Sequence, residues 1–188
     1  VNTLMNNLYD GQNIYFDYSA IRPEGARLMT MGGRASGPQP LIKLHDFIRE
    51  TMHNAQGRQL TTLECHDICN QIAEIVVVGG VRRSSQISLS DLQDTDMRHA
   101  KEWPFPIKRA MANNSAIYRE KPSAADFLKE WGSLALSGSG ERGIFNLEAA
   151  QSRAPSRRYS PKIEGTNPCG EIMLRDMQFC NLSEVVMR

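Results

Sequence analysis

Hydrophobic residues follow a helical spacing in three parts of the chain. Apolar residues recur every three or four positions between residues 41 and 52, which predicts an amphipathic helix. Thr61 and Glu64 lie three residues apart and fit a capping box, so we expect a second helix to run from there to about Val78. Ser123 predicts the cap of a third helix, whose apolar residues continue to Leu136.

Other stretches have the residue types of β-strands. Residues 13–19 are rich in aromatic side chains, and residues 84–90 alternate like a half-buried strand. Residues 143–146 predict a short strand, and two further apolar pieces follow at 171–174 and 179–186. Strands that alternate with helices predict an α/β fold with a mostly parallel sheet or barrel.

Three stretches are expected to be loops because they carry prolines, glycines or clustered charges. Residues 21–40 form the longest, and a loop of that length in a compact domain is often functional. Residues 91–106 read as an irregular connection, and residues 153–165 as a basic loop.

Composition narrows the class of protein. The chain has 188 residues, of which 40% are hydrophobic, and a net charge of +1. Such a balance predicts a globular protein whose overall charge attracts neither nucleic acid nor membranes. The first residue is Val1 and the last residues are apolar, so we expect an internal piece of a longer protein. No secretion signal follows Val1, which favours a cytoplasmic location with its four cysteines reduced.

The strongest chemical signal lies near the end of the chain. Asn167, Cys169 and Glu171 place an amide, a thiol and a carboxylate at alternate positions. In extended backbone, residues two apart share one face, so the three side chains would converge. Pro168 stiffens this segment and Gly170 permits an unusual dihedral angle. The pattern predicts a thiol site with a general base beside it.

Other interpretations of the cysteines remain open from the residues alone. A cysteine beside a proline and a glycine, as Cys169 is, often serves as a small packing residue. Cys180 follows eleven residues later, and that spacing lacks the short cysteine pairs of structural zinc sites. Cys65, His66 and Cys69 would need a fourth metal ligand that the sequence does not supply. We therefore expect Cys65 and Cys69 to be structural, and no metal site.

The segment Asn167-Pro-Cys-Gly-Glu-Ile172, followed by Phe179-Cys-Asn-Leu-Ser-Glu-Val185, resembles the finger loop and next strand of adenosylcobalamin-dependent (class II) ribonucleotide reductases. The resemblance covers nearly the whole chain and looks closest to the monomeric triphosphate-reducing branch. Four further motifs resemble that family in the same order: Ile21-Arg-Pro-Glu-Gly-Ala-Arg27, Gly32-Gly-Arg-Ala-Ser-Gly-Pro38, Gly79-Gly-Val-Arg-Arg-Ser84 and Met111-Ala-Asn-Asn-Ser115.

This resemblance implies both a fold and an activity. Residues 1–188 would form part of a ten-stranded α/β barrel, with an effector-loop region at about 20–90 and the finger loop at about 165–172. The activity would be thiyl-radical reduction of ribonucleotides, in the form of triphosphates, to 2′-deoxyribonucleotides. The resemblance also implies adenosylcobalamin, bound largely by residues outside this chain, a deoxynucleotide effector and a thioredoxin-type reductant.

The resemblance assigns roles to the site residues. Cys169 would carry the thiyl radical, Glu171 would accept the 3′-hydroxyl proton, and Asn167 would orient the ribose. Cys180 would be one of two reducing thiols, with its partner in an earlier strand. Effector and substrate contacts would come from a set of arginines, glycines and a serine: Arg22, Gly79, Gly80, Arg82, Arg83 and Ser84.

Two alternatives stay beside this interpretation. One is the large subunit of an oxygen-dependent reductase, which shares the asparagine, cysteine and glutamate but takes its radical from a second subunit. The other is a nucleotide-binding or interaction fragment without turnover. For any single one of the arginines, the alternative is a solvated surface charge. Asn113 and Asn114, in the fourth of the family motifs, are expected to be buried hydrogen-bonding groups rather than substrate ligands.

Overall fold

A computed structural model of the chain describes residues 1–30, 32–78, 81, 82, 84–157 and 162–187. These residues form two compact units. The first, called the helical unit below, comprises Val1–Ser85 with Pro106–Met111, and the second, called the sheet unit, comprises Gln86–Phe105 with Ala112–Arg188. Each unit is described by itself.

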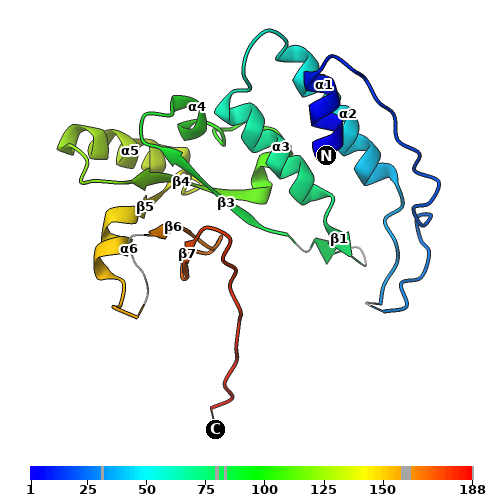
Figure 1. Ribbon diagram of the computed structural model, residues 1–188. Helices are drawn as coiled ribbons and strands as arrows, with labels where there is room; N and C mark the ends of the chain where they lie inside the picture. Colours follow the sequence, from blue (N-terminus) through cyan, green and yellow to red (C-terminus); the bar gives the residue numbers. More distant parts are fainter. Residues whose placement is uncertain (31, 79–80, 83, 158–161, 188) are drawn as a thin grey trace. The chain divides into compact units, whose positions relative to one another are not determined.

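Three helices build the helical unit around a small apolar core. Leu4, Leu44, Ile48 and Ile68 are buried there, one from the first helix, two from the second and one from the third. Its elements are α1 (Asn2–Tyr9), α2 (Gln39–Asn54), α3 (Thr62–Glu74), the short antiparallel strands β1 (Val77–Val78) and β2 (Val81–Arg82), and the 3₁₀ helix η1 (Ile107–Met111) (Figure 1).

The predicted capping box opens α3. The Thr61 hydroxyl accepts from the Glu64 backbone N–H at 3.1 Å, and the Glu64 carboxylate accepts from the Thr61 N–H at 2.8 Å. The predicted end at Val78 is wrong, because α3 stops at Glu74. Residues 75–78 are all β-branched, which favours a strand over a helix, and the last two form β1.

The predicted strand at residues 13–19 is also wrong, since this segment has no regular structure. Its aromatic residues pack against α2 instead. The Phe16 and His45 rings lie 4.7 Å apart, and the Tyr18 hydroxyl hydrogen-bonds His45 Nδ1 at 2.7 Å. Arg49 donates to the Ile14 carbonyl at 2.7 Å. The segment is therefore held by contacts with side chains of α2 and not by pairing with a neighbouring strand.

A parallel sheet organises the second unit. Among the described residues, β3 (Gln86–Asp91), β4 (Ala112–Tyr118) and β5 (Gly143–Asn146) pair in that order, with Gln86 opposite Ala112 and Ser115 opposite Gly143. The predictions of a mixed α/β fold, of strands near 84–90 and at 143–146, and of a helix capped by Ser123 are confirmed. That helix is α5 (Ala124–Ser137).

Two layers cover the sheet. The helices α4 (Thr95–Arg98) and α5 lie on one face, and α6 (Leu147–Arg153) with the antiparallel hairpin β6 (Ile163–Thr166) and β7 (Met173–Arg175) lies on the other (Figure 1). Two of these elements correct the sequence analysis, since α4 falls within the expected irregular connection 91–106 and β6 begins inside the expected loop 153–165. The apolar piece 179–186 forms no strand in the described structure.

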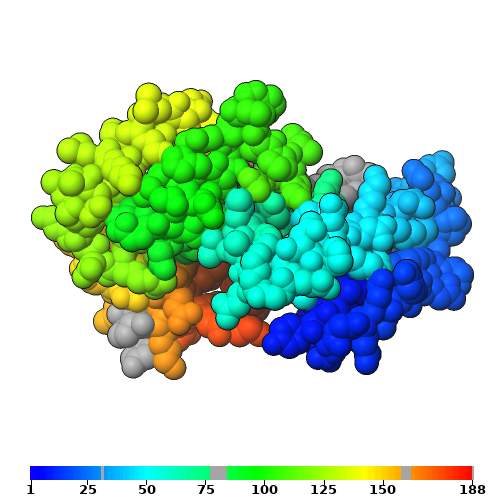
Figure 2. Space-filling view, turned by 90° about the horizontal axis from the view of Figure 1, so that it is seen from above, coloured from blue at the N-terminus to red at the C-terminus, as the bar shows by residue number. Residues whose placement is uncertain are grey.

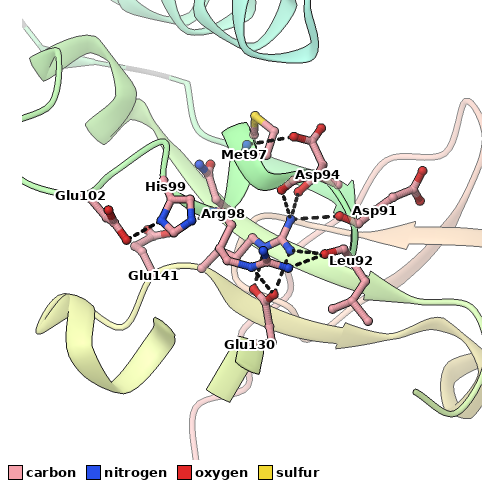
Figure 3. A network of polar contacts seen from close by, with 12 residues as sticks. Asp91, Leu92, Asp94, Met97, Arg98, His99, Glu102, Glu130 and Glu141 are labelled. Atoms are coloured by element: carbon pink, nitrogen blue, oxygen red, sulfur yellow. Dashed lines mark hydrogen bonds and ion pairs between the residues drawn. The ribbon is translucent and has the colours of Figure 1, made fainter. Parts of the chain in front are cut away.

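A buried ionic network joins α4 and α5 to the sheet (Figure 3). Glu130 of α5 is 1% exposed and accepts from Arg98 at 2.9 Å and from Arg142 at 2.7 Å. Arg142 also donates to Ser90 Oγ at 2.8 Å. Because Glu130 faces inward, the apolar residues of α5 face outward, with Trp131 53% exposed on a helix that lies at the surface in Figure 2.

Candidate functional site

The candidate thiol lies on the loop of residues 167–172, which joins β6 to β7. Asn167 closes this loop from both ends. Its backbone N–H donates to the Ile172 carbonyl at 3.1 Å, and its side-chain Oδ1 accepts from the Ile172 N–H at 2.9 Å. Its own carbonyl accepts from Gly170 N–H at 3.0 Å. We call residues 167–172 the thiol loop.

The backbone of the thiol loop turns rather than running extended, so the prediction of one shared face is wrong. Gly170 has φ +89°, a left-handed conformation that favours glycine. Asn167 is 5% exposed and points into the loop, whereas Cys169 and Glu171 are exposed. The structure therefore brings the thiol and the carboxylate to the surface of one short loop, and uses the amide to close it.

The hairpin beneath the thiol loop is fixed to the sheet. Ile163 of β6 is 1% exposed in a core shared with Ile117, and Met173 of β7 packs against the same core. Gln151 of α6 donates to the Ile163 carbonyl at 2.8 Å. At the tip, Asn113 Nδ2 donates to the Pro168 carbonyl at 2.7 Å. A rigid support of this kind limits the positions that a reactive side chain can take.

Asn113 is a residue whose role the sequence analysis missed. Asn114 is buried as expected, but its neighbour Asn113 is exposed and bonds to the thiol loop 55 residues further along the chain. The resemblance of residues 111–115 to a family strand was the only signal for it, and strand alternation would have put the two asparagines on opposite faces.

The remaining cysteines are free. Cys180 is partly exposed and lies in the segment 176–187, which leaves β7 without regular structure (Figure 1). Cys65 and Cys69 are exposed on α3, and their expected structural role stays a prediction. Burial of its surroundings and the neighbouring Cys65 thiol raise the pKa of Cys69. Among the described residues, no cluster of three or more His, Cys, Asp or Glu side chains suits a metal ion.

One predicted effector residue, Arg22, lines a cavity in the helical unit. Arg22 and Arg27 line a cavity of about 780 Å³, together with Ser36 and several apolar side chains. Gly37 closes one turn of its wall with φ +72°, and a Cβ there would lie 3.0 Å from the backbone N of Glu24. A concave site with cationic and apolar walls can receive an anionic ligand that has a flat apolar part.

The other predicted effector residues are less informative. Arg82 lies in β2, opposite Val77. The Ser84 hydroxyl donates to the Ala73 carbonyl at 2.6 Å and so satisfies an end of α3. Gly79, Gly80 and Arg83 lie outside the described residues. In the described part of the chain, no helix has the length and apolar character needed to cross a membrane.

Comparison with known proteins agrees with this picture. A family model described as "B12-dependent ribonucleotide reductase, insertion domain" matches residues 3–52. The chain is 38% identical over 179 residues to the adenosylcobalamin-dependent ribonucleoside-triphosphate reductase of Lacticaseibacillus paracasei, covering 92% of the chain and 23% of that relative. Proteins of the same name from Lactobacillus delbrueckii subsp. bulgaricus and Lactobacillus leichmannii are 36% and 35% identical over 186 residues, covering 93% of the chain and 24% of each. No solved structure matches the chain significantly.

The helices and the parallel sheet of the described residues place the chain in the α/β class of proteins. Within that class, the chain belongs to the adenosylcobalamin-dependent ribonucleotide reductase family, as the ordered motifs predicted. The chain spans about a quarter of the length of the curated relatives it matches.

Proposed function

We propose that the protein containing this chain reduces ribonucleoside triphosphates to 2′-deoxyribonucleotides, with Cys169 as the residue that carries the radical. The single observation that supports this most is the thiol loop, where an exposed free thiol and an exposed carboxylate lie two residues apart on a rigidly closed turn. The names of the relatives favour the adenosylcobalamin class over the oxygen-dependent one.

The described residues fit adenosylcobalamin in one respect only. Cys169 is exposed and free, as a thiol must be to lose its hydrogen atom to a radical. We assign no described residue to holding the corrin, and expect those contacts elsewhere in the protein. When bound, adenosylcobalamin supplies a carbon-centred radical that can take a hydrogen atom from a thiol.

The residues of the thiol loop have different roles in the proposed reaction. The Cys169 sulfur radical takes the hydrogen from the ribose C3′, forming an S–H bond and breaking a C–H bond of similar strength. Glu171 accepts the 3′-hydroxyl proton while the 2′-hydroxyl, protonated, leaves as water. Cys180 and a second thiol supply two hydrogen equivalents and become a disulfide, and Cys169 returns its hydrogen to C3′. One ribonucleotide and two thiols thus give one deoxyribonucleotide, one water and one disulfide.

Asn167 takes a more limited part in this proposal than the resemblance implied. Its Oδ1 accepts from the Ile172 N–H, so this oxygen is committed to closing the loop. We propose that its amide group orients the ribose hydroxyls only through Nδ2. Fixing the sugar relative to the Cys169 thiol lowers the entropic part of the activation free energy of the reaction.

We propose residues 20–90 as the effector-loop region, of which residues 20–85 belong to the helical unit. The cavity lined by Arg22 and Arg27 suits a deoxynucleotide, because guanidinium groups bind phosphate oxygens and the apolar wall accepts a base. The segment that contains Gly79, Gly80, Arg82, Arg83 and Ser84 would relay the effector to the substrate. Residues 1–188 would form part of a ten-stranded catalytic barrel, and the free thiols suit a cytoplasmic enzyme served by a thioredoxin-type reductant.

The experiment that tests this proposal replaces Cys169 with serine in the full-length protein. A hydroxyl O–H bond is too strong for the oxygen radical to form under these conditions, so kcat for deoxynucleotide formation should fall by at least about 1,000-fold, or about 4 kcal/mol. Cys65→Ser is the matched control, because Cys65 is also exposed but lies on α3. Deoxynucleotide formation by Cys169→Ser at the control's rate would refute the proposal.

A nucleotide-binding protein without turnover is the second candidate, favoured by the arginine-lined cavity. The same pair of variants separates the two candidates. Binding of deoxynucleotide that survives in both variants, with no turnover in the unmodified protein supplied with adenosylcobalamin and dithiol, would select the second candidate.

A further inference from the structure

A hydrogen bond links the sheet directly to the residue before the candidate radical cysteine. Asn113 Nδ2, on β4, donates to the Pro168 carbonyl at 2.7 Å. Both residues belong to the sheet unit. Pro168 has no backbone N–H, so its carbonyl is the one main-chain hydrogen-bonding group that it offers to the rest of the protein.

Holding this carbonyl fixes more than one atom. The peptide group between Pro168 and Cys169 is planar, so the direction of the Pro168 carbonyl also sets the direction of the Cys169 N–H and the position of its Cα. The φ angle of Pro168 is restricted by its ring. The Asn113 amide therefore controls the orientation with which the Cys169 side chain leaves the loop.

Asn113 lies on the correct face of the sheet for this contact. Residues 113 and 117 are four apart in β4, and side chains at even separations share one face. Ile117 packs with Ile163 of β6 in the core under the hairpin, so Asn113 continues the same row toward the tip of the hairpin. A Cβ at Gly165 would lie 3.3 Å from Leu89 Cδ1, which shows how closely β6 approaches this face.

The hairpin therefore has two separate attachments to the sheet. Apolar packing of Ile163 and Met173 fixes its base, and the Asn113 bond fixes its tip. Within the thiol loop, the bonds of Asn167 set the shape of the turn but not its height above the sheet. Among the described contacts, the Asn113 bond is the one that sets this height.

We propose that Asn113 is a positioning residue for Cys169, which it holds at the height and orientation required for hydrogen transfer from the ribose. This inference rests on the proposed function, since it assumes that Cys169 is the reacting group. Asn113 acts through the Pro168 carbonyl and touches no substrate. Its loss should lower kcat by about 10- to 100-fold, the effect of a displacement of about 1 Å, and leave KM within about twofold.

The test measures kcat and KM of Asn113→Ala, Asn113→Asp and Asn113→His in the full-length, cobalamin-supplied protein. Alanine removes the donor, and aspartate places a carboxylate against the carbonyl, so aspartate should be the more harmful. Histidine restores an N–H donor at a similar distance and should recover part of kcat. Asn7→Ala is the matched control, because the Asn7 amide also donates to a backbone carbonyl, that of Thr3 at 2.8 Å, but in the helical unit.

A second readout follows the loop itself. Hydrogen exchange at the Gly170 and Ile172 amides should accelerate in Asn113→Ala and return toward normal in Asn113→His. A kcat for Asn113→Ala within twofold of the unmodified protein, while Cys169→Ser is inactive, would overturn this inference and leave the proposed function standing. An active Cys169→Ser variant would instead remove the proposed function on which the inference rests.

Discussion

Two polar clusters of the sheet unit hold carboxylates in opposite conditions. In the buried network, Glu130 is 1% exposed and both its oxygens accept from guanidinium groups. In the thiol loop, Glu171 is exposed two residues from the exposed Cys169. The first cluster joins α4, α5 and the sheet, whereas the second presents its side chains to the outside.

The difference lies in which groups satisfy the local hydrogen bonds. In the network the charged side chains do so themselves, and a buried carboxylate whose lone pairs are occupied has nothing left for a ligand. In the thiol loop the backbone and the Asn167 amide close the turn, so the thiol of Cys169 and the carboxylate of Glu171 are not needed for that structural role. A reactive site thus depends on structural bonds made by groups other than the reacting ones.

The largest effect on stability is expected from Glu130→Gln. Burial alone would raise the pKa of Glu130, but hydrogen bonds from Arg142 and Arg98 outweigh it and hold the pKa below its usual value. The carboxylate is therefore charged at neutral pH, and its neutralisation leaves two buried guanidinium groups without an anion. We expect a loss of about 3–5 kcal/mol in the free energy of unfolding, measured by urea titration.

The control for this change is Glu120→Gln, because Glu120 is exposed and follows β4. Its effect should stay within about 0.5 kcal/mol. Equal stabilities of the two variants would break the comparison, because the buried network would then contribute no more than a surface charge.

A smaller effect is expected from Gly170→Ala in the thiol loop. No atom lies within 4 Å of a Cβ built there, so the cost comes from the backbone, whose φ of +89° an alanine rarely adopts. We expect a loss of about 1–2 kcal/mol together with slower turnover. Gly132→Ala should do the reverse, since Gly132 lies inside α5 with open space around it, and alanine there should stabilise by about 1 kcal/mol. A Gly170→Ala variant as stable as Gly132→Ala would show that the turn is not needed.

Local signals in the sequence were sufficient for several elements. The capping box at Thr61 and the cap at Ser123 predicted helix starts, because these bonds form within four residues. The alternation at residues 84–90 predicted β3 from neighbouring residue types alone, although its ladder bonds are made to the distant β4. The strand expected at residues 13–19 failed because its aromatic residues pack on His45 of α2, a contact no local pattern contains.

The same distinction applies to the candidate site. The thiol loop was found from six consecutive residues and their resemblance to a family motif. The inward face of α5 could not be predicted, because Glu130 is buried by arginines from other elements while Trp131 stays exposed. The role of Asn113 could not be predicted for a related reason. Its hydrogen-bond partner is 55 residues away and is a backbone carbonyl, a group that every residue possesses.

The smallest effect concerns an exposed ion pair, which sharpens the contrast with the buried network. The side-chain hydrogen bond from Arg58 and the backbone bond from Thr61 lower the pKa of Glu64 to about 2. Because the pKa is lowered on folding, this stabilisation is present above the ordinary value of 4.5 and is lost as the pH falls toward 2. Glu64 and Arg58 are 25% and 44% exposed, so solvent screening keeps the contribution below about 1 kcal/mol.

The variant that isolates this ion pair is Glu64→Gln, since glutamine can still accept from the Thr61 N–H and so keeps the capping box. The free energy of unfolding of the unmodified protein should exceed that of the variant at pH 6, and the two should converge as the pH is lowered from 4.5 toward 2, as urea titrations at each pH would measure. A difference that persists unchanged at pH 2 would mean that Glu64 stabilises α3 through shape rather than charge. A difference as large as that of Glu130→Gln would mean that exposure does not weaken the pair, and the contrast between exposed and buried carboxylates would fail for this protein.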